Sequence, residues 1–177
     1  MSMTTQGPIP VIVAWDPGLR TCGVSIFWMD WLIWAGLIVN TCGSKVRGQV
    51  AWDSMADAVQ SKLRTLILPP TYLYQVAYEN PQDYKRGAHL AHVRTEDIEQ
   101  LRGVNNAILK RLKPKRRVKY HPHDWKGSID KDVMTRRIVS RLRPEERLVI
   151  QPCAADLIHN VYDGVGVGMT AVGRRLI

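Results

Sequence analysis

The chain has 177 residues, enough for one domain with its own core, and 45% of them are hydrophobic. It carries 25 Lys and Arg against 16 Asp and Glu, a formal net charge of +9. This composition argues against a disordered chain. The basic excess favours nucleic acid as a partner over an anionic membrane surface, because each neutralised phosphate releases condensed counterions.

The first part of the chain predicts three strands in an antiparallel meander. The run 11–15 is continuously apolar and rich in β-branched residues, as expected of a strand buried on both faces, and it ends in an Asp-Pro-Gly turn at Asp16. The stretch 24–39 is apolar enough to be compared with a membrane span, but it contains Asp30 and many β-forming residues. Two strands that turn near Asp30, at 24–28 and 31–39, explain it better, so we expect no membrane contact.

The rest of the chain alternates between helical and strand patterns. Apolar spacing predicts helices at 54–68, 95–112, 130–142 and 154–172, strands at 74–78 and 117–120, and a polar loop at 82–94. The order β-β-β-α-β-α-β-α-α, with no internal repeat or linker, predicts a single α/β domain over 1–177. We expect a five-stranded mixed sheet flanked by helices.

Two carboxylates follow predicted strands. Asp16 stands where the first buried strand ends, and Glu79 ends the strand at 74–78. If these two strands are neighbours, both side chains project from the same edge of the sheet, where open α/β sheets bind ligands. The alternatives are that Asp16 only caps its turn and that Glu79 is a solvated residue at a strand end.

The last predicted helix carries the third carboxylate, Asp163. His159 lies four residues before it and Asp156 seven before it, so helical geometry places all three on one stripe. The stripe could simply face solvent. However, the helix is otherwise apolar and contains several glycines, each of which costs on the order of 1 kcal/mol relative to alanine. We therefore expect this helix to approach the sheet closely and to bring Asp163 near Asp16.

Three carboxylates at one sheet edge would repel one another unless a cation lies among them. Hard divalent cations such as Mg²⁺ or Mn²⁺ prefer oxygen ligands, and two such ions about 4 Å apart can cleave a phosphodiester. We hypothesise that Asp16 bridges the two ions. Glu79 would bind one ion, and Asp163 would bind the other, with His159 beside it.

Basic residues gather in the segment 110–119, where seven of ten residues are Lys or Arg. Such a density favours phosphate contact, although a solvated helix end is the alternative. The candidate phosphate-binding residues are Lys113, Lys115, Arg116 and Arg117. In the loop after Glu79, Tyr84 stands beside Lys85 and Arg86, a combination suited to a stacked base, or else Tyr84 is an ordinary exposed tyrosine.

Five segments stand out in order along the chain: VAWDPGLRTCGVSIF (13–27), VAYENP (76–81), QLRGVNNAIL (100–109), HPHDWKGSIDKDV (121–133) and HNVYDGVGVGM (159–169). Together they resemble the RuvC Holliday-junction resolvases, and the WKG and HNVYDG forms are most like phage or plasmid members of that family. The resemblance implies an RNase H-like fold and metal-dependent cleavage of four-way DNA junctions. It also implies a homodimer, because a two-fold junction needs two symmetric nicks.

The resemblance also implies particular roles for residues. Asp16, Glu79 and Asp163 match the family's catalytic acids, with His159 or Asp156 supporting them. Lys126 and Lys131 match lysines near the scissile phosphate, and Arg102 belongs to the family's Arg-Gly pair on a DNA-facing helix.

Other classes of protein share some of these sequence features. A less specific RNase H-like nuclease would cut flaps, forks or RNA, and a non-catalytic DNA-binding module would lack one of the acids. A sugar kinase or actin-like ATPase shares an Asp-Gly strand turn but needs a second domain of similar size. Residues 166–171 match GxGxxA, yet no βαβ unit follows, so we expect no nucleotide cofactor.

The cysteines and the first ten residues indicate the cellular compartment in which the protein is expected. Three scattered cysteines form no CxxC pair, which favours a reducing compartment. The first ten residues lack the charged and apolar regions of a signal peptide. We expect a cytoplasmic protein of a bacterium or of a phage-infected cell.

Overall fold

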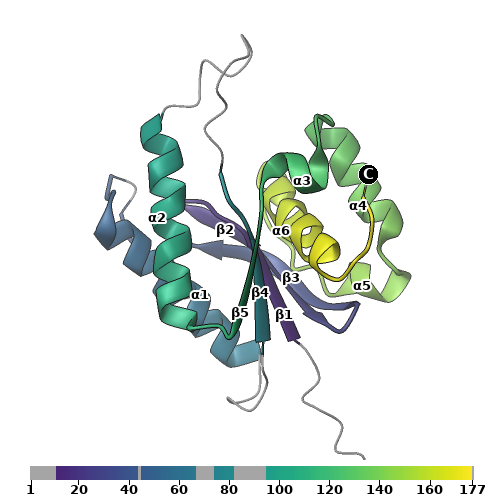
Figure 1. Cartoon of the computed structure of the whole chain (residues 1–177), viewed down its shortest axis with the longest axis horizontal. Helices are drawn as coiled ribbons and strands as arrows, with labels where there is room; N and C mark the ends of the chain where they lie inside the picture. Colours follow the sequence, from purple (N-terminus) through teal and green to yellow (C-terminus); the bar gives the residue numbers. More distant parts are fainter. Residues whose placement is uncertain (1–10, 44, 67–73, 82–94, 177) are drawn as a thin grey trace, which may run out of the picture.

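The computed structural model describes residues 11–43, 45–66, 74–81 and 95–176. Its centre is a five-stranded sheet in the order β3-β2-β1-β4-β5 (Figure 1). The β1–β2 and β2–β3 pairs are antiparallel, whereas the β1–β4 and β4–β5 pairs are parallel. The strands are β1 (Val11–Asp16), β2 (Thr21–Trp28), β3 (Trp31–Val39), β4 (Tyr74–Glu79) and β5 (Arg116–Tyr120). The predicted mixed sheet, including the three-stranded meander, is confirmed.

Helices cover both faces of the sheet (Figure 1). They are α1 (Gln49–Leu66), α2 (Thr95–Leu112), α3 (Pro122–Lys126), α4 (Lys131–Arg141), α5 (Pro144–Leu148) and α6 (Ile158–Ala171). In β1, Val13 and Trp15 pack towards α1 and α2, while Ile12 and Ala14 pack towards α6. Alternate side chains of a strand point to opposite faces, so a strand between two helical layers must be apolar throughout, as this run is.

Helix α6 lies unusually close to the sheet, because glycines remove side chains from the contact. A Cβ atom on Gly164 would lie 2.4 Å from the carbonyl oxygen of Gly23 in β2, and one on Gly23 would lie 1.7 Å from the carbonyl oxygen of Asn160. Ser25 of β2 donates a 2.8 Å hydrogen bond to the carbonyl oxygen of Gly164. The close approach expected from the glycines is therefore found.

Two short helices were absent from the sequence-based prediction, and both begin with the same local pattern. In α3, Pro122 is the first residue, and the Asp124 carboxylate accepts a 2.7 Å hydrogen bond from the backbone N–H of His121. In α5, Pro144 is first, and Glu146 accepts one of 2.9 Å from the N–H of Arg143. Five residues are too few to show a helical period, whereas a proline at the first position and an acid at the third were the available signals.

Several predicted boundaries were wrong. Helix α1 begins at Gln49, five residues before the predicted start, and β5 begins one residue earlier than predicted. The error that matters most for the site concerns α6, which begins at Ile158 and not at residue 154. The residues before it form a turn, so Asp156 is exposed and lies outside the helix. Among the described residues, no helix combines the length and apolarity needed to cross a membrane.

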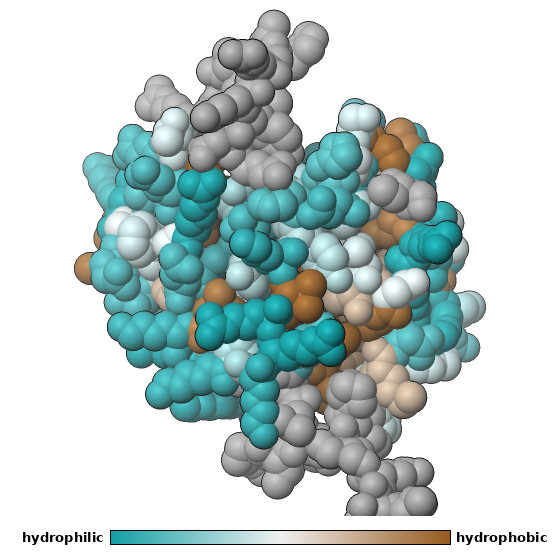
Figure 2. Space-filling view, viewed as in Figure 1, coloured by the Kyte–Doolittle hydropathy of each residue, from teal (hydrophilic) through white to brown (hydrophobic). Residues whose placement is uncertain are grey.

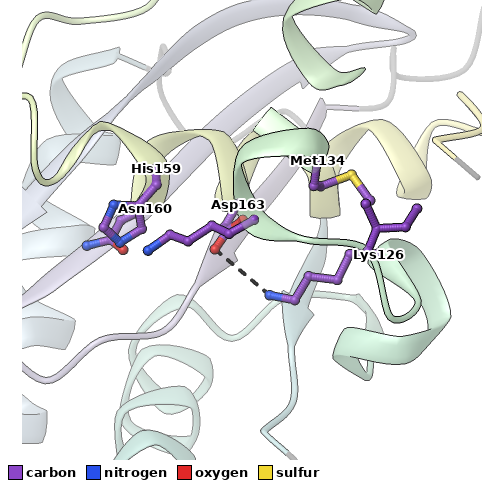
Figure 3. A pocket seen from close by; sticks show the side chains of 7 residues that line it. Lys126, Met134, His159, Asn160 and Asp163 are labelled. Carbon is purple, nitrogen blue, oxygen red and sulfur yellow. Dashed lines mark ion pairs between the residues drawn. The ribbon is translucent and has the colours of Figure 1, made fainter. Parts of the chain in front are cut away.

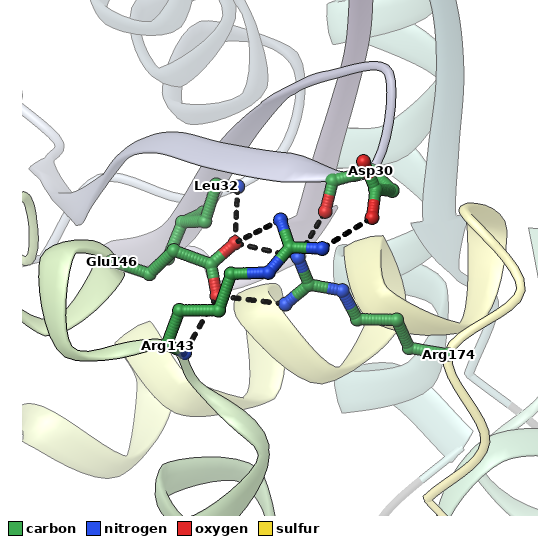
Figure 4. Close-up of polar contacts among 5 residues, drawn as sticks. All are labelled: Asp30, Leu32, Arg143, Glu146 and Arg174. Carbon is green, nitrogen blue, oxygen red and sulfur yellow. Dashed lines mark hydrogen bonds and ion pairs between the residues drawn. The ribbon is translucent and has the colours of Figure 1, made fainter.

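The β2–β3 hairpin is tied to the C-terminal part of the chain by a buried carboxylate (Figure 4). Glu146 is 1% exposed and accepts hydrogen bonds from the backbone N–H of Leu32 at 2.8 Å and from both terminal nitrogens of Arg174, at 2.8 and 2.6 Å. Arg143 pairs with Asp30 in the hairpin turn at 2.6 Å, and Arg174 also donates to the carbonyl oxygen of Asp30. One acidic side chain thus joins β3, α5 and the segment after α6.

The contact between α6 and β2 can be tested with Gly164→Ala. The added methyl group meets backbone atoms that cannot rotate away, so we expect the free energy of unfolding to fall by about 1–3 kcal/mol, even though alanine is the better helix former. Urea unfolding measures this change. The control is Gly43→Ala, whose Cβ would meet nothing closer than a Val46 methyl at 3.8 Å, with an expected change within about 0.5 kcal/mol. Equal stability of the two variants would contradict the close contact.

The Glu146 network predicts a pH dependence of stability. Burial alone would raise the pKa of Glu146, but the hydrogen bonds from Arg174, Leu32 and Arg143 outweigh it and hold the pKa below its ordinary range. The unfolded chain therefore binds the proton more tightly. The stabilisation is complete above the unfolded pKa of about 4.3 and is lost as the pH falls through the lower folded pKa.

Glu146→Gln leaves the Arg174 guanidinium without its anionic partner, so we expect it to cost about 3–5 kcal/mol at pH 7. Urea unfolding across pH 3–7 should show the difference between wild type and variant shrinking in acid. A difference that stays constant over this range would contradict the assignment.

Candidate active site

The carboxylates of Asp16 and Glu79 share one edge of the sheet. Because β1 and β4 are parallel and pair Trp15 with Tyr78, the next residues, Asp16 and Glu79, leave their strands at the same level. The Trp15 and Tyr78 rings stack with centroids 5.3 Å apart, which holds the two strand ends together. The placement expected from the sequence is found.

Asp163 reaches the same edge from α6. Asp16 pairs across the sheet with Gly23, and Gly23 is the residue that touches the backbone of α6 at Asn160 and Val161. Asp163 follows within one turn of that contact. The close approach of α6 is therefore what brings the third carboxylate to the other two.

Lys126, the last residue of α3, lies among the acids. Its Nζ atom is 3.1 Å from Oε2 of Glu79 and 3.9 Å from Oδ2 of Asp163. The three side chains are largely buried, with exposed fractions of 25% for Lys126, 12% for Glu79 and 16% for Asp163. A single ammonium group thus bridges two carboxylates that come from different layers of the fold.

The electrostatics of the cluster are those of crowded anions. Burial, then the charge of Glu79, then that of Asp163 raise the pKa of Asp16 well above its ordinary value. Burial also raises the pKa values of Glu79 and Asp163, against the opposing charge of Lys126. Burial would lower the pKa of Lys126, but Glu79, Asp163 and Asp16 together raise it. The cluster carries more negative charge than one lysine neutralises.

A cavity of about 270 Å³ opens beside this cluster (Figure 3). It is lined by Lys126, Ile129, Lys131, Met134, His159, Asn160 and Asp163. Asp163 and Lys126 point towards each other at its wall, and His159 lies one helical turn before Asp163 (Figure 3). Acidic, basic and imidazole groups therefore line one hollow.

The donor set suits a divalent metal ion. Three carboxylates offer the hard oxygen ligands that Mg²⁺ and Mn²⁺ prefer, and the Lys126 ammonium shows that a positive charge is stable between two of them. Within the part of the chain that the structure describes, no three acidic, imidazole or thiol groups stand in a metal-ligand arrangement. The Lys126 ammonium lies near both Glu79 and Asp163.

Of the supporting residues, His159 and exposed Lys131 line the same cavity as Lys126 and Asp163, so both lie near the cluster. The shared helical stripe predicted for Asp156 is wrong, since Asp156 lies before α6 and is exposed.

The candidate DNA-binding residues that the structure describes lie in two places. Half-buried Arg102 is near the acids, with Nη2 3.5 Å from the carbonyl oxygen of Pro81, two residues after Glu79. Lys113, Lys115, Arg116 and Arg117 are exposed. Arg116 is level with Gln75 in the neighbouring strand, about 13 Å along the sheet from the level of Glu79, given a rise of about 3.3 Å per residue. Tyr84, Lys85 and Arg86 lie outside the described residues.

Two polar residues near the acids were missed by reasoning from the sequence. The indole N–H of Trp125 donates a 2.9 Å hydrogen bond to Oε2 of Glu79. The amide of Asn105, which is 2% exposed, donates one of 2.9 Å to the carbonyl oxygen of Glu79. Both residues lie within segments that resemble the resolvases, but neither residue type by itself predicts a hydrogen bond to Glu79.

The geometry can be compared with that of known proteins. No family model matches the chain, and no curated protein matches it either. Among solved structures, Thermus thermophilus RuvC in complex with a Holliday junction substrate is similar, with a TM-score of 0.62 and 15% identity over 92% of each chain. A second Thermus thermophilus RuvC structure gives a TM-score of 0.58 and 13% identity, over 92% of this chain and 93% of that one.

The yeast mitochondrial Holliday junction resolvase Ydc2 is also similar, with a TM-score of 0.48 and 10% identity, over 97% of this chain and 81% of that one. The two RuvC comparisons show that the chain has an RNase H-like fold. More closely, the fold is RuvC-like, as the five sequence segments indicated.

The crowding of anions predicts that Asp16 is unfavourable for stability in the absence of metal. Asp16→Asn removes one of three mutually repelling carboxylates with little change of shape, so we expect it to raise the free energy of unfolding in a chelating buffer at pH 7.5. The control is Asp156→Asn, at an exposed position, with an expected change within about 0.5 kcal/mol. An Asp16→Asn variant less stable than wild type in urea would show that the charge of Asp16 is fully compensated.

Proposed function

We propose that this protein is a metal-dependent endonuclease that resolves four-way DNA junctions by paired symmetric nicks. The observation that carries the proposal is the convergence of Asp16, Glu79 and Asp163 at one edge of a RuvC-like fold, with Lys126 among them. Thermus thermophilus RuvC, the structure with the TM-score of 0.62, was solved in complex with a Holliday junction substrate.

In this proposal the three carboxylates hold two Mg²⁺ or Mn²⁺ ions, with His159 beside Asp163. The bound ions would activate a water molecule and stabilise the leaving oxygen of a phosphodiester. Lys126 and Lys131 would contribute positive charge near the scissile phosphate. We assign no ligand role to Asp156, which is exposed and lies before α6.

The DNA would extend from the site along the edge strand β5 towards the basic residues at its start. Hydrophilic side chains gather over the end of α2 and the start of β5 (Figure 2), where the exposed Lys113, Lys115, Arg116 and Arg117 lie. A duplex is wide enough to cover the 13 Å or so between these residues and the acids. Arg102 would bind a phosphate closer to the site, and Tyr84, Lys85 and Arg86 would meet the branch point.

The proposal includes a homodimer. A four-way junction has two-fold symmetry, and a pair of symmetric nicks needs two active sites related by the same symmetry. Sedimentation of the protein alone and with a synthetic junction measures whether two copies bind one junction.

The decisive experiment incubates the protein with a labelled four-way junction, with and without Mg²⁺ or Mn²⁺, alongside duplex, fork, flap and single-strand controls. We expect paired nicks in the junction only when metal is present. Asp16→Ala should abolish cleavage while junction binding and the folded state are retained. The matched control Asp156→Ala should cut like wild type.

Other outcomes favour other functions. Metal-dependent cutting of forks and flaps as well would replace the junction resolvase with a general branched-DNA nuclease. Binding without cutting under either metal would leave a DNA-binding module. Cleavage retained by Asp16→Ala would overturn the assignment of the site.

The basic residues at the start of β5 make a separate prediction. Replacing Arg116 and Arg117 together by Glu should weaken junction binding at low salt. It should also reduce the slope of log affinity against log salt by about 2, since each lost phosphate contact removes about one from the slope. Fluorescence anisotropy at several salt concentrations measures both effects. An unchanged slope would show that these two residues do not bind phosphate.

A further inference from the structure

The Glu79 carboxylate is held by two neighbouring side chains of one short helix. Trp125 donates through its indole N–H to Oε2 at 2.9 Å, and the Nζ atom of Lys126 lies 3.1 Å from the same oxygen. The ammonium also lies over the Trp125 ring, 4.7 Å from its centroid. Helix α3 therefore presents one neutral donor and one charged donor to a single oxygen atom.

The two donors differ in how firmly they are held. The ammonium group of Lys126 stands at the end of a flexible four-carbon side chain and is a point charge without a preferred direction. Trp125 is 1% exposed, and its ring packs against α6 so closely that a Cβ on Gly166 would lie 2.3 Å from a ring carbon. The direction of the Trp125 N–H is thus set by packing against the helix that carries Asp163.

The main chain of Glu79 is held from the other face of the sheet. The Asn105 amide donates a 2.9 Å hydrogen bond to the carbonyl oxygen of Glu79, and its own oxygen accepts one of 2.7 Å from the buried indole N–H of Trp15. With the backbone held in this way, the Trp125 hydrogen bond selects among the rotamers that remain to the Glu79 side chain.

We propose that Trp125 is a positioning residue that orients the Glu79 carboxylate for binding a divalent cation. The inference rests on the proposed function, since it takes Glu79 as a metal ligand. Hydrogen-bonded partners of metal ligands raise affinity by holding the ligand in its binding orientation before the ion arrives, and losing such a partner typically costs about 10–100-fold in metal affinity. Lys126 cannot take over this task, because a divalent ion competes with its charge.

The test is Trp125→Phe, which keeps an aromatic ring in the packed site and removes the N–H group. Calorimetric titration of Mn²⁺ without DNA should show affinity about 10–100-fold weaker than that of wild type. The matched control is Trp52→Phe, which removes an indole that donates a 3.0 Å hydrogen bond to Gln100 between α1 and α2. Its Mn²⁺ affinity should equal that of wild type, and urea unfolding of each variant reports its folded state.

A measurement on the wild-type protein tests the same role of Trp125 without relying on a variant that folds. In a Mg²⁺ titration followed by ¹H–¹⁵N NMR, the indole resonance of Trp125 should shift and saturate, while that of Trp52 stays in place. A wild-type protein that binds neither metal would overturn the proposed function itself. Wild-type binding with a stationary Trp125 resonance, or with undiminished affinity in a folded Trp125→Phe variant, would overturn only the positioning role.

Discussion

The structure depends on the contact between Gly23 of β2 and Gly164 of α6, where two backbones meet without side chains between them. This contact sets the distance of α6 from the sheet and so decides whether Asp163 can reach Asp16. The cost of glycine in a helix, on the order of 1 kcal/mol for each residue, is offset by close packing along the whole contact. Gly166 and Gly168 extend it to Trp125 and to Phe27.

The close contact has an electrostatic consequence. It gathers three acids in a region that is largely closed to water, where like charges repel strongly. Lys126 offsets part of this repulsion, while burial, followed by the charges of Glu79 and Asp163, raises the pKa of Asp16. Under the proposed function, bound cations would offset the remaining repulsion, and the site would serve activity at the expense of stability.

Much of this architecture could be predicted from the residues. Continuous apolar runs marked the buried strands, and the carboxylates at strand ends were placed correctly, because parallel neighbours end at the same edge. The glycines of the last helix indicated its close approach. What could not be predicted came from two sources. Helices α3 and α5 are too short for periodicity, and the extent of α6 was judged from apolar residues alone, which drew Asp156 into it.

The partners of Glu79 could not be predicted for another reason. Trp125 and Asn105 are distant from Glu79 in sequence and meet it only through the packing of α3 and α2 on opposite faces of the sheet. A tryptophan is commonly buried in a core, and a single sequence does not show which acceptor its N–H will meet. The position of the basic segment likewise follows from strand direction, since β5 runs towards the acids and begins with the arginines.

The position of α6 late in the chain determines when the three acids come together during synthesis. Asp16 and Glu79 emerge from the ribosome early, and the sheet that carries them can form before α6, the last of the described elements, has been made. Until α6 docks, the acids at the sheet edge number two, and the apolar face that α6 covers is open. A nascent chain therefore lacks the complete cluster of acids while its apolar sheet face is most exposed to aggregation, and the cluster is completed together with the core.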